Sequence, residues 1–215
     1  MKNIVLTGIG GQGTVLAAKI LAQAAQARGW HVRTAETIGM AQRGGSVVSH
    51  VRMGDAGEQV ASPLVPNGQA DMLIAFEPGE GVRMARILKP GGVMVTASRV
   101  VQPVTASLSK EPYEAAAMIE ALCAKAACVK GVAGSAPKPG SQQSISMLYV
   151  VNETPVLEHI GNAKALNIVL LTVAVHAGVL DLTVQEFKDA VSACVKPRFK
   201  DMNLAAIDAV EELLA

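Results

Sequence analysis

Aromatic side chains and concentrated charge are both scarce in this sequence. Phe, Trp and Tyr together make up 3% of its 215 residues, and the formal net charge at pH 7 is +1. No basic block is longer than a pair. A protein that binds nucleic acid needs a concentrated positive face, so the composition argues against a nucleic-acid partner.

Cysteine is also scarce, and its spacing does not suit a metal. Cys123, Cys128 and Cys194 are odd in number and form no CxxC pair, whereas zinc sites and iron–sulfur clusters usually take four ligands at characteristic spacings. The histidines add no ligand spacing of their own. We therefore expect no metal site in this chain, and buried free thiols in a reducing cytosol.

Long apolar runs are missing as well. The longest apolar stretch, residues 165–180, is interrupted by Asn167, Thr172 and His176, and a membrane-spanning helix needs about 20 mostly apolar residues. We expect a buried helix here and no membrane contact. The N-terminus enters a predicted strand without the charged leader and apolar centre of an export signal, so we expect a cytoplasmic protein.

The sequence is rich in aliphatic side chains arranged in an alternating βα order. Half of its residues are apolar, which suits parallel strands that are covered on both faces. Periodicity and turn signals predict a single domain over residues 1–215: an open, mainly parallel, Rossmann-like α/β sheet with helices on both faces and a helical C-terminal region. Residues 55–57 predict a turn that pairs Ser46–Arg52 with a strand near Val60, and residues 131–147 predict a long loop.

The first of two glycine-rich segments, Gly8-Ile9-Gly10-Gly11-Gln12-Gly13, lies between a predicted strand and a predicted helix. Unpaired N–H groups and the positive helix end can form an anion pocket there. The glycine spacing also meets the dinucleotide template, with Glu36 near the position of a ribose-binding acid. From these residues alone, three readings stay open: NAD or FAD binding, another anion or partner surface, and tight helix packing.

The second segment, Gly39-Met40-Ala41-Gln42-Arg43-Gly44-Gly45-Ser46, adds a cation to a backbone that can approach a ligand closely. Together with Val51-Arg52, the two segments resemble the gamma domain of 2-oxoacid:ferredoxin oxidoreductases. In that family a GxGGQG turn is followed by an RGG loop and a strand ending in arginine. The resemblance continues to Gly161-Asn162 and Asn167, so it covers most of the chain, and it is closest to the indolepyruvate branch.

The resemblance implies that catalysis is shared with a larger chain. Enzymes of this family decarboxylate a 2-oxoacid on thiamine diphosphate, pass electrons through iron–sulfur clusters to ferredoxin, and transfer the acyl group to coenzyme A. This sequence has no Gly-Asp-Gly segment for Mg²⁺ and diphosphate and no cysteine series for [4Fe-4S] clusters. The expected function is therefore a non-autonomous small subunit that converts an aryl 2-oxoacid such as indolepyruvate to an acyl-CoA, with these cofactors on the large subunit.

The resemblance also implies which residues contact a ligand or the partner's active site, with no catalytic residue in this chain alone. The expected contacts are Gly10, Gly11, Gln12, Gly13, Gln42, Arg43, Gly44, Gly45 and Ser46. Arg43 could be a surface charge, a structural group bonded to loop carbonyls, or a contact to coenzyme A phosphates or the substrate carboxylate. Gln12 could tie the two loops together or reach the partner's active site.

Other functions fit parts of the sequence. The GxGxxG spacing and Glu36 would suit an independent NAD- or FAD-binding Rossmann oxidoreductase, and the same domain could serve a pyruvate or other 2-oxoacid enzyme. The two loops could also be a structural clamp that is only buried against a partner. A dependent subunit should expose an apolar docking patch, for which residues 166–178 and 187–214 are the candidates.

Overall fold

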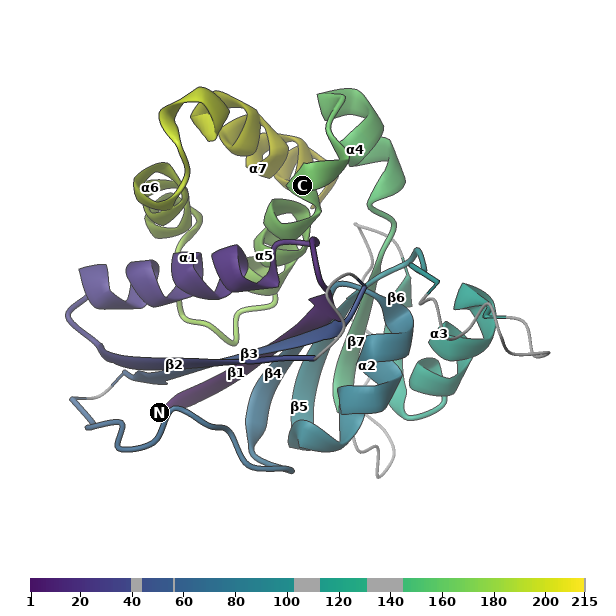
Figure 1. The fold of residues 1–215 in the computed structure, drawn as a ribbon, viewed down its shortest axis with the longest axis horizontal. Coiled ribbons are helices and arrows are strands. Elements are labelled where there is room, and N and C mark those ends of the chain that lie inside the picture. The colour runs from purple at the N-terminus through teal and green to yellow at the C-terminus, as the bar shows by residue number, and fades with distance from the viewer. Residues whose placement is uncertain (40–43, 56, 103–112, 131–144, 215) are drawn as a thin grey trace.

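The computed structural model describes residues 1–39, 44–55, 57–102, 113–130 and 145–214, which form one sheet with helices on both faces (Figure 1). The strands are β1 (Lys2–Ile9), β2 (His31–Ile38), β3 (Ser46–Gly54), β4 (Ala70–Ala75), β5 (Leu88–Ala97), β6 (Ala126–Lys130) and β7 (Ile145–Val151). The α-helices are α1 (Thr14–Ala27), α2 (Pro78–Met84), α3 (Ala115–Cys123), α4 (Thr154–Ile160), α5 (Leu166–His176), α6 (Val184–Cys194) and α7 (Lys200–Leu214). Short 3-10 helices lie at Ala85–Ile87, Ala163–Ala165 (η3) and Pro197–Phe199 (η4).

The seven strands lie in the order β2-β3-β1-β4-β5-β7-β6. In the part of this order that runs β1-β4-β5-β7-β6, each neighbouring pair of strands is parallel. Strand β3 runs antiparallel to both β1 and β2. The predicted open, mainly parallel α/β architecture is therefore confirmed. Because the carboxyl ends of parallel strands meet at one edge, the segments that follow β1, β4, β5 and β7 come together there.

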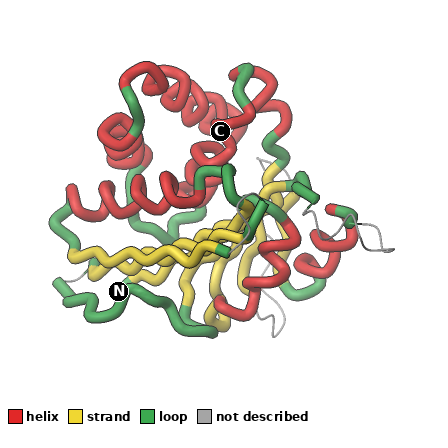
Figure 2. Tube along the Cα trace, in the orientation of Figure 1, coloured by secondary structure: helices red, strands yellow, loops and turns green. Residues whose placement is uncertain are grey.

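The two faces of the sheet carry separate apolar layers, since side chains alternate along each strand. In β1, Ile4 and Leu6 pack with α1, α5, α6 and α7, whereas Val5 packs on the opposite side with residues of α2 and α3. Figure 2 shows this division, with helices on either side of the strands. Nine residues of α5 are buried, which confirms the predicted buried helix. Most of the first candidate docking segment, residues 166–178, is therefore core.

The predicted hairpin is at the wrong place. β2 and β3 pair antiparallel through the second glycine segment, with Ile38 opposite Val47, and residues 57–69 contain no strand. Histidines of the neighbouring strands hold this later segment: His31 Nδ1 accepts a hydrogen bond from the Val60 N–H at 3.0 Å, and His50 Nδ1 accepts one from the Val65 N–H at 3.2 Å. Side-chain acceptors thus replace the strand ladder that the pattern predicts.

The loop predicted at residues 131–147 is only partly tested. Residues 131–144 lie outside the described part of the chain, and residues 145–147 begin β7, which inserts between β5 and β6. The Gly- and Pro-rich run obscured this strand, although Ile145, Leu148 and Val150 show the burial expected of a strand. The capping box predicted before α6 is confirmed, with Thr183 and Glu186 bonded to each other's backbone N–H groups.

The prediction of buried free thiols is correct for Cys194 only in that its thiol is free, since the residue is half-buried, and it is wrong for Cys123, which is disulfide-bonded. Within one chain, an odd cysteine count leaves at least one thiol unpaired and allows two others to pair, so sequence alone could not tell free thiols from a disulfide.

Over the residues the structure describes, none of the helices has the length and apolar character needed to cross a bilayer.

Candidate functional site

The two glycine segments meet at the carboxyl end of β1. The first segment begins with the last two residues of this strand, Gly8 and Ile9, and the second enters β3 with Ser46 opposite Ile9. The Gly10 N–H donates a hydrogen bond to the Gly45 carbonyl at 2.8 Å. Gly44 and Gly45 thus lie in the described part of the second loop, whereas the predicted contacts Gln42 and Arg43 lie outside it.

Gln12 closes the first loop onto the sheet. Its Oε1 accepts a hydrogen bond from the Ile9 N–H at 2.7 Å, and its Nε2 donates one to the Phe76 carbonyl at 3.0 Å. Phe76 directly follows β4, and its N–H donates to the Thr7 carbonyl at 2.8 Å. Among the described residues, Gln12 therefore ties the first loop to the ends of β1 and β4, and not to the second loop.

The three glycines of the GxGxxG spacing leave room for protein atoms. A Cβ on Gly8 would lie 2.8 Å from Gln12 Oε1, and a Cβ on Gly13 would lie 3.0 Å from Asn167 Nδ2. The Gly10 position faces the Gly45 carbonyl at 3.6 Å. In a dinucleotide site the second glycine makes room for the pyrophosphate. Here that space is next to the second loop, which favours the packing and partner-surface readings.

Glu36 does not take the place of a ribose-binding acid. It lies on β2, which is separated from β1 by the antiparallel strand β3. In a dinucleotide-binding fold the acid follows the strand next to the first one. The structure therefore gives no support to an NAD- or FAD-binding reading of the first loop.

Glu80 of α2 joins the second loop to β1. Its Oε2 accepts hydrogen bonds from Thr7 Oγ1 at 3.1 Å and from Ser46 Oγ at 2.7 Å. The Arg83 guanidinium bonds both to this carboxylate and to Ser46 Oγ. Ser46, a predicted ligand contact, is thus held by protein groups. Sequence reasoning missed Glu80 and Arg83, because only the fold brings α2 beside the start of β3.

A second carboxylate, Glu77, is fully buried at the start of α2. Its Oε2 accepts the Glu80 N–H at 2.8 Å, and its Oε1 accepts the Tyr113 hydroxyl at 3.1 Å. Burial of the phenol and the neighbouring Glu77 charge raise the pKa of Tyr113 far above its ordinary value. Tyr113 therefore stays protonated and donates to Glu77, which fixes the N-terminus of α2 beside the glycine loops.

Beside the first loop lies a cavity of about 270 Å³, lined in part by Gly11, Gln12, Arg99 and Lys164. Arg99 follows β5 and Lys164 belongs to η3. Because the two residues are far apart in the sequence, their shared cavity could not be predicted from it. The cavity also contains Glu153, which is 2% exposed and accepts hydrogen bonds from the Ser98 N–H at 3.0 Å and hydroxyl at 3.1 Å. Neither Arg99 nor Lys164 forms an ion pair within the described part of the chain. Both are therefore able to receive an anion.

Exposed aliphatic side chains surround this edge of the sheet. Ile38, at the end of β2, is 65% exposed, and Val15, in the first turn of α1, is 45% exposed. Val82 of α2 and Val101 after β5 are 41% and 44% exposed. All four are on or shortly after elements that begin or end at this edge, and large apolar groups left exposed there are of the kind that a protein partner covers. The strand-end arginine, Arg52, lies away from this edge and bonds to Asn3 and Ser62.

Fold and loops together define the class: a gamma-type α/β domain of the kind found in 2-oxoacid oxidoreductases. The chain belongs to the pyruvate ferredoxin/flavodoxin oxidoreductase family, which it matches over residues 3–213. It is similar to the indolepyruvate oxidoreductase subunit IorB of Pyrococcus horikoshii, at 33% identity over 96% of this chain and 92% of that protein. The chain is therefore a small subunit of a 2-oxoacid:ferredoxin oxidoreductase.

Two solved structures share the fold. The gamma subunit of a keto/oxoacid ferredoxin oxidoreductase from Geobacter sulfurreducens has a TM-score of 0.64 and 21% identity, over 99% of this chain and 97% of that chain. A 2-oxoglutarate:ferredoxin oxidoreductase from Magnetococcus marinus, with 2-oxoglutarate, coenzyme A and succinyl-CoA bound, has a TM-score of 0.65 and 17% identity, over 99% of this chain and 30% of that chain. The domain thus also occurs within a longer polypeptide.

Proposed function

We propose that residues 1–215 act as one gamma-type domain of a cytoplasmic enzyme that oxidatively decarboxylates an aryl 2-oxoacid such as indolepyruvate to an acyl-CoA, with ferredoxin as the electron acceptor. The naming of the relative from Pyrococcus horikoshii supports the indolepyruvate assignment. A large partner subunit would hold thiamine diphosphate, Mg²⁺ and the [4Fe-4S] clusters. Within the described residues, no group of three or more His, Cys, Asp or Glu side chains is placed to hold a metal ion.

The observation that carries the proposal is the composite edge formed by the two glycine loops. The Gly10–Gly45 hydrogen bond joins the loops, and Arg99 and Lys164 line the adjoining cavity. When thiamine diphosphate is bound on the partner, it supplies the carbanion chemistry of decarboxylation. The contribution of this chain is to cover that site, exclude water and hold an anionic group.

The cavity beside the first loop suits the anionic group of either reactant. Guanidinium and ammonium groups form strong charge-assisted hydrogen bonds with phosphate and carboxylate oxygens. We propose that Arg99 and Lys164, together with Arg43 of the second loop, bind a phosphate of coenzyme A or the carboxylate of the 2-oxoacid. Gly10, Gly11, Gln12, Gly13, Gly44, Gly45 and Ser46 would then shape the backbone that contacts the partner's active site.

Reconstitution with the large subunit tests the proposal. Arg99→Ala and Arg43→Ala are each expected to raise KM for coenzyme A or for the 2-oxoacid without changing assembly, because each removes an anion contact. Arg86→Ala is the matched control, since Arg86 is an exposed arginine in the 3-10 helix after α2. Unchanged turnover and unchanged dependence on both reactants in both variants would contradict the proposal.

The same experiment separates the two rival functions. If the loops are only a structural clamp, loop variants will weaken assembly and leave the kinetic constants of the assembled complex unchanged. An independent oxidoreductase would bind NADH, NADPH or FAD to the isolated chain at micromolar concentration. We expect no such binding, because the GxGxxG glycines face Gln12, Gly45 and Asn167.

A further inference from the structure

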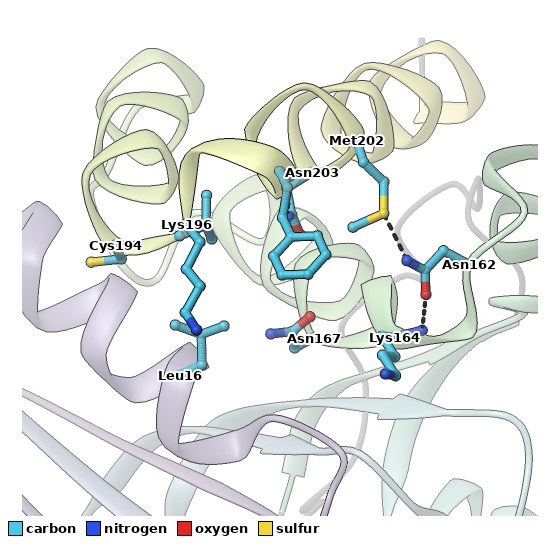
Figure 3. Close-up of a pocket in the computed structure, with 10 residues that line it drawn as sticks. Leu16, Asn162, Lys164, Asn167, Cys194, Lys196, Met202 and Asn203 are labelled. Atoms are coloured by element: carbon cyan, nitrogen blue, oxygen red, sulfur yellow. Dashed lines mark hydrogen bonds between the residues drawn. The ribbon is translucent and has the colours of Figure 1, made fainter.

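A second cavity lies on the helical side of the sheet, behind the first glycine loop (Figure 3). It has a volume of about 320 Å³. Its walls come from the start of α1, from η3 and the start of α5, and from the chain between the end of α6 and the start of α7. The volume is at the lower end of the range for small-molecule sites. It equals about ten water molecules at ~30 Å³ each, which suits a single-ring organic molecule.

One part of the wall is apolar. Leu16, Val195, Phe199 and Met202 line the cavity, and Phe199 is 40% exposed although it is a large aromatic side chain. The aromatic ring and the polarisable methionine provide a surface suited to an apolar ligand body. The uncovered area of Phe199 is consistent with a ligand that completes its packing.

The amide groups of the wall keep hydrogen-bonding capacity. Asn167 is 3% exposed, and its Oδ1 accepts the Ile168 N–H at 3.0 Å. Its Nδ2 has no hydrogen-bond partner among the described residues, and it lines the cavity next to Gly13. Asn203 is 6% exposed and donates through Nδ2 to the Phe199 carbonyl at 2.6 Å. Asn167 Nδ2 is not among the fully buried unpaired polar atoms of the described residues, so it is open to the cavity, where a ligand acceptor could take its hydrogen bond in place of water.

The charged groups of the wall are all cations. Lys164 and Lys196 line the cavity, and no carboxylate of the described residues does so. Neither lysine forms an ion pair with another residue of the described ranges. In Figure 3 the amide nitrogen of Asn167 is on the side of Lys196, and its amide oxygen is on the side of Lys164. An anion at the Asn167 amide nitrogen would meet this donor and the ammonium group of Lys196.

We infer that this cavity binds a small organic anion with an apolar body, such as an aromatic monocarboxylate. The carboxylate would accept hydrogen bonds from Asn167 Nδ2 and from Lys196 Nζ, and the ring would pack against Phe199 and Met202. The inference goes beyond the proposed function, because the site lies among the helices and its occupancy is measured on this chain without turnover. A failure of the proposed catalytic role would therefore leave it untouched.

Isothermal titration of the full chain with phenylacetate tests the inference. We expect saturable binding, and an affinity about tenfold weaker in Lys196→Gln, because this variant removes one charge-assisted hydrogen bond. Lys125→Gln is the matched control, since Lys125 is exposed and follows α3 on the opposite face. Two further probes separate the parts of the ligand: 2-phenylethanol lacks the charge and inorganic phosphate lacks the ring, so both should bind more weakly.

A second readout uses the unaltered protein. Cys194 lines the cavity and is a free, half-buried thiol. Bound phenylacetate should slow its alkylation by iodoacetamide, measured on the Cys194 peptide by mass spectrometry. Absence of saturable binding, equal affinity in Lys196→Gln, equally tight binding of 2-phenylethanol or phosphate, or an unchanged Cys194 alkylation rate would each overturn the inference.

Discussion

Gly13 is the residue at which backbone conformation and packing act together. Its φ is 85°, in the left-handed region, and a Cβ there would lie 3.0 Å from Asn167 Nδ2. We predict that Gly13→Ala lowers the free energy of unfolding by about 2–4 kcal/mol, because left-handed strain adds to overpacking. Urea denaturation of the chain measures this loss.

Gly29 provides the control for this substitution. It has a similar φ of 76°, but nothing lies within 4 Å of its Cβ position. Gly29→Ala should therefore cost only the backbone strain, about 1–2 kcal/mol. Equal losses at the two glycines would show that Asn167 leaves room for a side chain at the start of α1.

His50 should make the stability of the chain depend on pH. It is 7% exposed, its Nδ1 accepts the Val65 N–H, and burial lowers its pKa from the ordinary value of 6.5. Below pH 6.5 the unfolded chain binds a proton at His50 more readily than the folded chain does. The contribution of the neutral His50 to the free energy of unfolding is therefore fully present above pH 6.5 and is lost as the pH falls. Urea midpoints between pH 8 and pH 5 should decline less in His50→Gln, whereas His159→Gln, at an exposed position, should follow the unaltered protein.

Single residues were the hardest level to predict from sequence. The glycine segment around Gln12 predicted a role for this side chain in loop or partner contacts. Its hydrogen bonds to Ile9 and Phe76, however, depend on the end of β4 lying beside β1. Arg99 and Lys164 belong to different segments and carry no motif, so only the fold brings them to one cavity. The turn after β1 could be predicted because a turn depends on local sequence, whereas a cavity depends on contacts between distant segments.

Among the elements, α2 fixes the second glycine loop through one carboxylate. Glu80 is 14% exposed and accepts hydrogen bonds from Thr7, Ser46 and Arg83. We predict that Glu80→Gln lowers the free energy of unfolding by about 1–3 kcal/mol, since it weakens hydrogen bonds to a charged group. It should also reduce turnover of the reconstituted complex, because the entry into β3 loses its fixed position.

Glu120→Gln is a suitable comparison for the α2 variant, because Glu120 is an exposed carboxylate on α3. It should leave both stability and turnover unchanged. Loss of turnover in Glu80→Gln without loss of stability would still assign the carboxylate a positioning role. If neither quantity changes, α2 does not control the second loop.

Elements with strong local signals were predicted well, and elements defined by pairing were not. The Thr183–Glu186 capping box and the apolar run of β4 are both local signals that the structure confirms. The hairpin was misplaced, because the turn at residues 55–57 looked stronger than the glycine loop that joins β2 to β3. β7 was missed because its position between β5 and β6 is a long-range property of the sheet.

For the whole molecule, the edge of the sheet where Val15, Ile38, Val82 and Val101 are exposed is the expected docking face. Ile38 is 65% exposed, and burying an isoleucine side chain at an interface is worth about 1.5–3 kcal/mol. We predict that Ile38→Ser weakens association with the large subunit by about tenfold or more, without unfolding the chain. Leu64→Ser is the control, because Leu64 is 53% exposed on the segment bonded to Arg52. Equal effects of the two variants on the dissociation constant would contradict this docking face.

The overall class could be read from the sequence because two separate loop motifs and the βα alternation agree. The docking face could not, since the apolar patterns of the C-terminal helices look the same whether they face a core or a partner. Burial resolves this ambiguity for α5, which packs inside the molecule, whereas residues 187–214 carry both buried and exposed side chains.

The contact that joins the two loops has an experimental consequence of its own. The Gly10 N–H and the Gly45 carbonyl are both main-chain groups, so exchanging one coded side chain for another leaves both atoms in place. A mutational scan would report the crowding caused by a new side chain and would remain blind to the bond itself. Chemical synthesis offers the direct route: replacing the peptide amide at Gly10 by an ester deletes the donor while keeping the shape of the loop.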